Sequence, residues 1–215
     1  MSHELLRVTE IFTSLQGESS RVGLPTTFVR LTGCPLRCRW CDTAYAFHGG
    51  SRMTVAEVVD AVRARGVRSV CVTGGEPLAQ PACRGLLTAL ADAGCDVALE
   101  TSGALSIAEV EARVHIVMDL KAPGSGEVAK NDWGNLDHLK PSDEVKVVLT
   151  DRADYEWAVA VVTERALDRR CHVLFSPAAG LLSPRLLAEW IVADRLPVRF
   201  QLQLHKVLWG DERGR

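Results

Sequence analysis

The chain has 215 residues, of which 47% are hydrophobic, and this is enough apolar sequence to bury the core of one large domain. Its 25 lysines and arginines nearly balance 27 aspartates and glutamates, a charge balance that disfavours a nucleic-acid-binding protein. No stretch approaches the roughly 18 apolar residues of a membrane helix, and the first residues lack a signal-peptide pattern. We therefore expect a single domain over residues 1–215 that works in the cytoplasm without a membrane partner.

Short β-branched runs alternate with amphipathic stretches along almost the whole chain, as in a parallel α/β fold. Strands are expected at 6–12, 27–31, 69–73, 96–100, 115–119, 144–149, 171–176 and 199–204. Helices are expected at 54–65, 81–93, 154–167 and 184–193. Thr54 and Glu57 have the spacing of a capping box, and Ser106 and Glu109 repeat that signal for a helix start.

Six βα-type repeats predict a partial (β/α)6 barrel, in which ligands bind at the carboxyl ends of the strands. The segment 122–142 interrupts the pattern because it is rich in Gly, Pro, Asn and Asp, and it forms an unusually long connection. Long connections in compact domains are often functional, so this segment is a candidate part of the site.

Three of the seven cysteines follow the predicted strand 27–31 at C-x3-C-x2-C spacing: Cys34, Cys38 and Cys41. The other four are scattered, so the pattern favours a metal site in a reducing compartment over a disulfide framework. A structural zinc ion needs four protein ligands, and His48 is close enough in sequence to be the fourth. A 4Fe-4S cluster held by three thiolates instead keeps one iron open for chemistry. The spacing alone leaves both alternatives open.

The cysteine loop, with the aromatic Trp40 just before its last cysteine, resembles that of the radical S-adenosylmethionine superfamily. The segment Gly74-Gly75-Glu76-Pro77, one βα unit later, resembles a second motif of the same superfamily. The resemblance implies that the three cysteines hold a 4Fe-4S cluster whose open iron binds S-adenosylmethionine. Reductive cleavage of that cofactor would produce a radical that abstracts hydrogen from the substrate.

Further segments resemble one family, the 7-carboxy-7-deazaguanine synthases, over nearly the whole chain. They are residues 11–18, 28–31, 41–43, 74–77, 100–103, 119–121, 142–146, 175–177 and 203–206. The resemblance implies a carbon–nitrogen lyase that converts 6-carboxy-5,6,7,8-tetrahydropterin to 7-carboxy-7-deazaguanine with loss of ammonia, in queuosine biosynthesis. It also implies Mg²⁺, a homodimer, and a flavodoxin or ferredoxin as electron donor.

The same resemblance assigns the site residues. Substrate contacts are expected from Leu15, Gln16, Gly17, Glu18, Arg30, Thr101, Lys206 and Arg215, with the C-terminal segment closing over the pterin. Cofactor contacts are expected from Trp40, Cys41, Asp42, Gly75, Glu76, Gly103, Ser142, Asp143 and Glu144, and a Mg²⁺ contact from Thr43. The roles of Lys121 and His205 stay open.

Two other functions compete with this interpretation. A glycyl-radical activating enzyme shares the cysteine loop and a similar Gly-Gly-Glu-Pro motif, but it acts on a protein. A small iron–sulfur or zinc module for redox or binding would need only the cysteines. Residues 15–18 and 203–206 favour the synthase, because an activating enzyme has no evident need for them.

Overall fold

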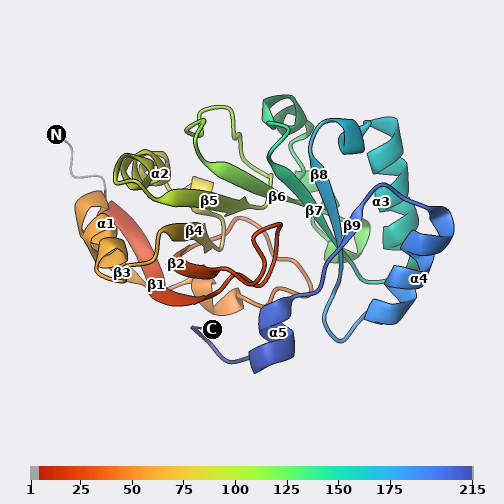
Figure 1. Ribbon diagram of the computed structural model, residues 1–215, viewed down its shortest axis with the longest axis horizontal. Coiled ribbons are helices and arrows are strands. Elements are labelled where there is room, and N and C mark those ends of the chain that lie inside the picture. Colours follow the sequence, from red (N-terminus) through yellow and green to blue (C-terminus); the bar gives the residue numbers. More distant parts are fainter. Residues whose placement is uncertain (1–4, 215) are drawn as a thin grey trace.

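The computed structural model describes residues 5–214, which form a single open sheet in the order β3-β1-β2-β4-β5-β6-β7-β8-β9 (Figure 1). The strands are β1 (Leu5–Leu15), β2 (Pro25–Leu31), β3 (Ser51–Thr54), β4 (Ser69–Gly74), β5 (Asp96–Thr101), β6 (His115–Lys121), β7 (Glu144–Leu149), β8 (His172–Pro177) and β9 (Arg199–Phe200). From β2 through β9 the neighbouring strands are parallel, whereas β1 is antiparallel to β2 and β3. This arrangement confirms the predicted α/β class and the mostly parallel sheet.

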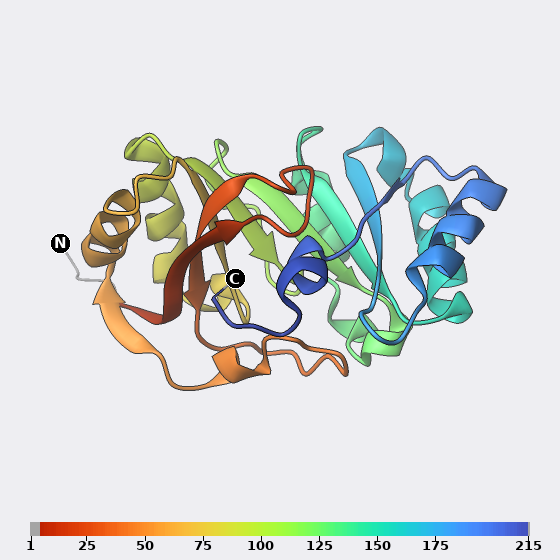
Figure 2. The same ribbon diagram turned by 60° about the horizontal axis from the view of Figure 1, so that its bottom comes forward.

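The four longer helices cover the outer face of the curved sheet, and a short one lies across the inner face (Figure 2). The outer helices are α1 (Val55–Arg63), α2 (Ala82–Asp92), α3 (Arg152–Glu164) and α4 (Pro184–Asp194), and the inner one is α5 (Leu204–Trp209). The predicted capping box of α1 is confirmed: Thr54 Oγ1 accepts from the Glu57 amide, and the Glu57 carboxylate accepts from the Thr54 amide.

Side chains alternate across the sheet, so that one face is apolar and the other polar. Leu31, Val72, Leu99, Met118 and Val147 are buried in the hydrophobic core with the outer helices. Residues on the inner face of the central strands include several charged and polar ones. The inner face is therefore the one able to bind a polar ligand.

The structure corrects two sequence expectations. No α-helix begins at Ser106, and the connections on either side of β6 contain turns and the short 3-10 helices η3 (Pro123–Ser125), η4 (Val128–Lys130) and η5 (Trp133–His138). The barrel repeat is therefore incomplete in its helices. The predicted strand 199–204 ends at Phe200, because the chain turns into α5.

Within residues 5–214, no helix is both long and apolar enough to span a membrane.

Candidate active site

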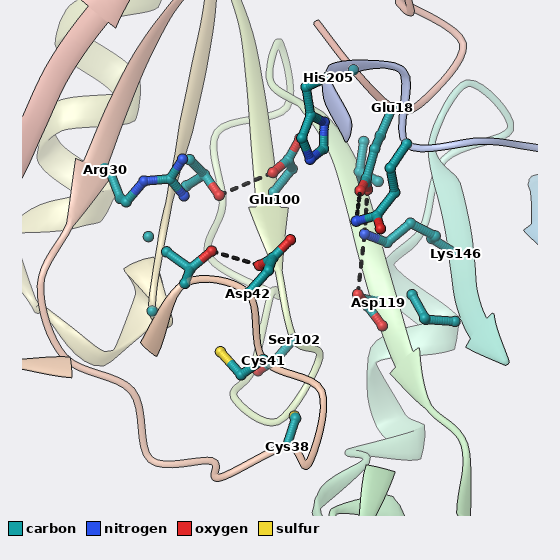
Figure 3. A pocket seen from close by; sticks show the side chains of 18 of the residues that line it. Glu18, Arg30, Cys38, Cys41, Asp42, Glu100, Ser102, Asp119, Lys146 and His205 are labelled. Carbon is teal, nitrogen blue, oxygen red and sulfur yellow. Dashed lines mark hydrogen bonds and ion pairs between the residues drawn. The ribbon is translucent and has the colours of Figure 1, made fainter. Parts of the chain in front are cut away.

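A cavity of about 530 Å³ opens on the inner face, toward the carboxyl ends of the parallel strands. This volume lies in the range of small-molecule sites. Its walls are the cysteine loop after β2, the β1–β2 loop, the central strands and the segment containing α5 (Figure 3). All three cysteines of the C-x3-C-x2-C motif line it, so the structure brings the predicted metal ligands to a ligand-sized space.

The cysteine loop presents three free, partly buried thiols, Cys34, Cys38 and Cys41. Burial raises the pKa of each thiol, so stable thiolates here require a positively charged group. Three thiolate donors on one loop match the chemistry of an iron–sulfur cluster, and the residues therefore fit that group. Among residues 5–214, no three Cys, His, Asp or Glu side chains are gathered closely enough to hold a single ion.

Gly75 allows the end of β4 to pack directly against the cysteine loop. A Cβ atom at Gly75 would lie 2.2 Å from the Gly33 carbonyl oxygen and 2.8 Å from the Cys34 Cβ. Two backbone hydrogen bonds fix this approach, from the Gly75 amide to the Leu31 carbonyl (3.1 Å) and from the Glu76 amide to the Gly33 carbonyl (2.8 Å). The glycine therefore sets the position of the first cysteine.

Glu76 does not face the cavity, contrary to the expectation that it binds the cofactor. Its carboxylate is fully buried and accepts hydrogen bonds from the Leu78 amide, the Thr101 hydroxyl and both the amide and hydroxyl of Ser102. A carboxylate so surrounded by donors is already satisfied by the protein. Glu76 joins the ends of β4 and β5, and Thr101 and Ser102 line the cavity next to it.

Arg30 points into the cavity from β2, as expected for a residue that binds a substrate carboxylate. Its Nε donates to Glu10 (2.7 Å), and Tyr45 donates to the same carboxylate oxygen (2.7 Å). On the neighbouring strands, Thr73 donates to Glu100 (2.9 Å), and Gln16 also donates to Glu100 (3.2 Å). One wall of the cavity thus presents a guanidinium next to a carboxylate and an amide.

The opposite wall carries a chain of buried charges. Lys146 contacts the carboxylates of Glu18 and Asp119, the latter at 3.2 Å, and Asp119 also pairs with Lys121 at 3.1 Å (Figure 3). Burial alone would lower the pKa of Lys146, but Glu18 and Asp119 raise it well above its ordinary value. Gln203 donates to the second oxygen of Glu18 (2.8 Å), which connects this network to the C-terminal segment.

Asp42 and Thr43 provide adjacent oxygen ligands beside the last cysteine. The Thr43 hydroxyl donates to Asp42 at 2.7 Å. Burial alone would raise the pKa of Asp42, but the Thr43 hydroxyl and the charge of Lys146 lower it below its ordinary value. A hydroxyl next to an ionised carboxylate suits a hard cation such as Mg²⁺, so the predicted ligand Thr43 fits this ion.

Most of the predicted site residues line the cavity: Leu15, Gln16, Gly17, Glu18, Arg30, Cys34, Cys38, Trp40, Cys41, Asp42, Thr43, Gly75, Thr101 and Lys206. Gly103 packs instead against β6, where an added Cβ would lie 2.9 Å from Met118 Cγ. Arg215 lies outside the described residues.

The expected cofactor contacts Ser142, Asp143 and Glu144 are not part of the cavity lining. They lie at the amino-terminal end of β7, opposite the end that carries the cysteine loop. Asp143 is fully buried and accepts from the Ile116 and Lys140 amides. The structure thus places these three residues away from the cavity, because an acidic turn that opens a parallel strand lies at the edge opposite the ligand edge.

Several polar residues without an expected site role also line the cavity: Thr73, Glu100, Asp119, Lys121, Lys146, Gln203 and His205. A signal for some was available, because Thr73 and Glu100 are polar residues near the carboxyl ends of apolar strands. Lys146 lies within a strand whose residues are all buried, and no local pattern marks it as part of a site.

Comparison with known proteins agrees with this geometry. The Radical SAM superfamily matches residues 28–124, the region from β2 through the cysteine loop to η3. The chain is 48% identical to a 7-carboxy-7-deazaguanine synthase of Chlorobaculum tepidum, over 97% of both chains. It is 42% identical to another from Koribacter versatilis, over 96% of this chain and 98% of that one. The crystal structure of QueE from Escherichia coli has the same fold, with a TM-score of 0.78 at 23% identity, covering 94% of this chain and 96% of that one.

The three-cysteine loop on a parallel half-barrel defines a radical S-adenosylmethionine protein. The identity of 48% and 42% to curated relatives over nearly their full length then identifies the family within this superfamily. The chain belongs to the 7-carboxy-7-deazaguanine synthase family.

Proposed function

We propose that this protein converts 6-carboxy-5,6,7,8-tetrahydropterin to 7-carboxy-7-deazaguanine with loss of ammonia, as a carbon–nitrogen lyase of 7-deazapurine biosynthesis. The observation that carries the proposal is the identity of 48% over 97% of both chains with a curated 7-carboxy-7-deazaguanine synthase. The cavity supports it, because the cysteine loop and the polar wall of β2, β4 and β5 line the same space.

Cys34, Cys38 and Cys41 would hold the 4Fe-4S cluster, and S-adenosylmethionine would bind beside it near Trp40 and Gly75. When bound, the reduced cluster and S-adenosylmethionine supply the radical that abstracts hydrogen from the substrate. The protein's own contribution is to hold the substrate next to this group and keep water away. The buried Leu36 and the aromatic Phe47 in the cavity lining serve the second task.

Arg30 is the proposed partner of the substrate carboxylate. Within residues 5–214, the ion pair of Arg30 with Glu10 is made by the Nε atom. The two terminal nitrogens of the guanidinium are therefore available for a planar acid. Glu100 and Gln16 lie beside it and would pair the donor and acceptor edge of the pterin. Asp42 and Thr43 would hold Mg²⁺ at the same wall, where the ion contributes a second positive charge toward the carboxylate.

The test is an anaerobic reconstitution. Cluster-loaded protein, a chemical reductant, S-adenosylmethionine, Mg²⁺ and carboxytetrahydropterin should give the deazaguanine acid, identified by absorbance and mass. Cys38→Ala should abolish the product, whereas Cys95→Ala should retain it, because Cys95 is not part of the cavity lining. Formation of 5'-deoxyadenosine without the deazaguanine product would contradict the proposed substrate while leaving the radical chemistry in place.

The competing functions are not favoured. The relatives with 48% and 42% identity are both 7-carboxy-7-deazaguanine synthases, and neither is a glycyl-radical activating enzyme. An iron–sulfur or zinc carrier would have no use for a cavity of about 530 Å³ lined by Arg30, Glu100 and Lys146 beside its cysteines.

We further propose a homodimer that works in the cytoplasm and receives electrons from a flavodoxin or ferredoxin. The free cysteines of the described residues favour a reducing compartment. Light scattering of the loaded protein tests the dimer. Replacement of the chemical reductant by a reduced flavodoxin, with product formation as the measurement, tests the donor.

A further inference from the structure

The loop between β1 and β2 has two ends with different surroundings. Gln16, Gly17 and Glu18 line the cavity, and the Gly17 carbonyl accepts from the Leu204 amide (2.9 Å) at the start of α5. Figure 2 shows the loop lying across the strands beside α5. Farther along, the loop leaves the cavity and reaches the amino-terminal ends of β6 and β7. Backbone hydrogen bonds of Gln16 with Gly23 and Leu24 (both 2.8 Å) fix the base of the loop, and contacts at its far end restrain the residues between.

Glu144 holds that far end. Its carboxylate is fully buried at the first residue of β7 and accepts from the Ser20 amide at 2.9 and 3.1 Å, and from the Ser20 hydroxyl. His115 Nε2, at the first residue of β6, lies 2.9 Å from the same carboxylate. Burial alone would raise the pKa of Glu144, but the contacts with His115 and Ser20 lower it below its ordinary value. An ionised, buried carboxylate is a strong acceptor for the loop.

The backbone between the two ends needs such a restraint. Ser19 is buried and has a φ of +68°, in the left-handed region that a serine adopts only when its surroundings impose it. Ser19 lies directly between Glu18, which contacts Lys146 inside the cavity, and Ser20, which contacts Glu144 outside it. Because the backbone turns at Ser19, the contact of Ser20 with Glu144 also restrains the direction in which Glu18 points.

We propose that Glu144, supported by His115, is a positioning residue for the substrate: by fixing Ser20 it keeps Gln16, Gly17 and Glu18 in place against the pterin. The residue that the sequence suggested as a cofactor contact acts instead through the loop. This inference rests on the proposed function, because it supposes that the cavity end of the loop meets the pterin and that the cofactor lies at the cysteine loop.

The experiment uses the reconstituted holoenzyme and two variants, Ser20→Ala and Glu144→Gln. Ser20→Ala removes the hydroxyl donor and keeps the backbone amide donor, and the loss of one hydrogen bond to a buried charged group changes an equilibrium by about tenfold. The KM for carboxytetrahydropterin should therefore rise about tenfold in each variant. The KM for S-adenosylmethionine, the iron content and the kcat at saturating pterin should stay within about twofold of wild type. Ser20 is exposed, so its substitution leaves a folded protein even where Glu144→Gln does not.

Ser142→Ala is the matched control, because Ser142 is an exposed serine two residues from Glu144 that does not line the cavity. It should leave the KM for the pterin unchanged. Amide hydrogen exchange should be faster over residues 17–24 in Ser20→Ala and unchanged in the control. Exchange confined to the loop separates positioning from a general loss of stability.

An unchanged KM for the pterin in Ser20→Ala would overturn the inference while the proposed function stands. A parallel rise in both KM values, with loss of iron, would overturn it as well, because it would indicate a general structural role. If the wild-type holoenzyme made no deazaguanine acid, the proposed function would fail and the inference with it.

Discussion

The buried charges on the wall formed by β6 and β7 give a quantitative prediction, for which the perturbation is Lys146→Met. Methionine has a similar length and no charge, so it removes the cation with little change in packing. The side chains of Glu18 and Asp119 are 11% and 17% exposed, so neither carboxylate partner gains water easily when the ammonium is lost. Asp119 keeps Lys121 at 3.1 Å, whereas Glu18 keeps the neutral Gln203 amide at 2.8 Å and no second cation among residues 5–214.

The cost therefore falls mainly on Glu18. Removal of one partner from a buried ion pair costs about 3–5 kcal/mol, because an uncompensated charge stays behind. Because Gln203 still donates to Glu18, we expect a loss of unfolding free energy at the lower end of this range, about 3 kcal/mol. This is a large part of the roughly 5–15 kcal/mol that stabilises a typical domain. For a chain of this length it corresponds to a decrease in Tm of about 6–12 °C.

The assay is urea unfolding of the cluster-free protein under anaerobic conditions, followed by tryptophan fluorescence. The double variant Lys146→Met with Glu18→Gln should lose less free energy of unfolding than the two single variants added together, since it removes the stranded charge. Arg185→Met is the control, because the Arg185–Glu189 pair is exposed and should contribute nothing measurable. The reasoning would be refuted if Lys146→Met lost less than about 1 kcal/mol of unfolding free energy, or if the losses of the two single variants simply added in the double variant.

Three further changes test other parts of the site and core. Glu10→Gln removes the charge that orients Arg30, so the KM for the pterin should rise about tenfold with unchanged iron content; an unchanged KM would contradict this role. Gly17→Ala would place a Cβ 2.1 Å from His205 Nδ1, so it should displace the C-terminal segment and lower kcat/KM at least tenfold, and wild-type kinetics would contradict it. Burial raises the pKa of the Cys171 thiol to about 11. The stability that the neutral thiol contributes is therefore present below pH 9 and is lost as the pH rises through 11. Alkylation of this thiol, followed by peptide mass analysis, should be slow at pH 8 and accelerate toward pH 11, and rapid alkylation at pH 8 would contradict the raised pKa.

Local signals predicted the elements whose causes are local. Thr54 and Glu57 form the capping box that their spacing predicts, and an amphipathic helix follows them. Ser106 and Glu109 have the same spacing, yet the chain there forms a turn. The Ile107 amide, directly after Ser106, donates to Asn135 Oδ1 (3.0 Å), a residue of the later 3-10 helix η5. The capping signal therefore predicts a helix start only where tertiary contacts do not hold the chain in another conformation.

The site was predictable to the extent that it is contiguous in sequence. The cysteine loop and the β1–β2 loop each bring neighbouring residues to the cavity, so motifs identified them. The Glu18–Lys146–Asp119 network joins three elements that are distant in the chain. Asp119 and Lys146 meet because they are paired in register on β6 and β7, and the β1–β2 loop brings Glu18 against Lys146. Glu144 was expected at the cofactor because residues 142–146 resemble a family segment, and such a resemblance does not show which end of the strand faces the ligand.

The Gly-Gly-Glu-Pro segment has structural roles that its resemblance to a superfamily motif did not indicate. Its glycine is needed because the backbone of β4 touches the cysteine loop, where any side chain would meet Gly33 and Cys34. Its glutamate is needed because one buried carboxylate satisfies Thr101 and Ser102 at the end of the next strand. Both residues thus pack within the protein, Gly75 at the cavity wall and Glu76 behind it, and they hold the cysteine loop next to the end of β5. A radical enzyme depends on that placement, because hydrogen abstraction requires the substrate to lie within contact of the group held at the cysteine loop.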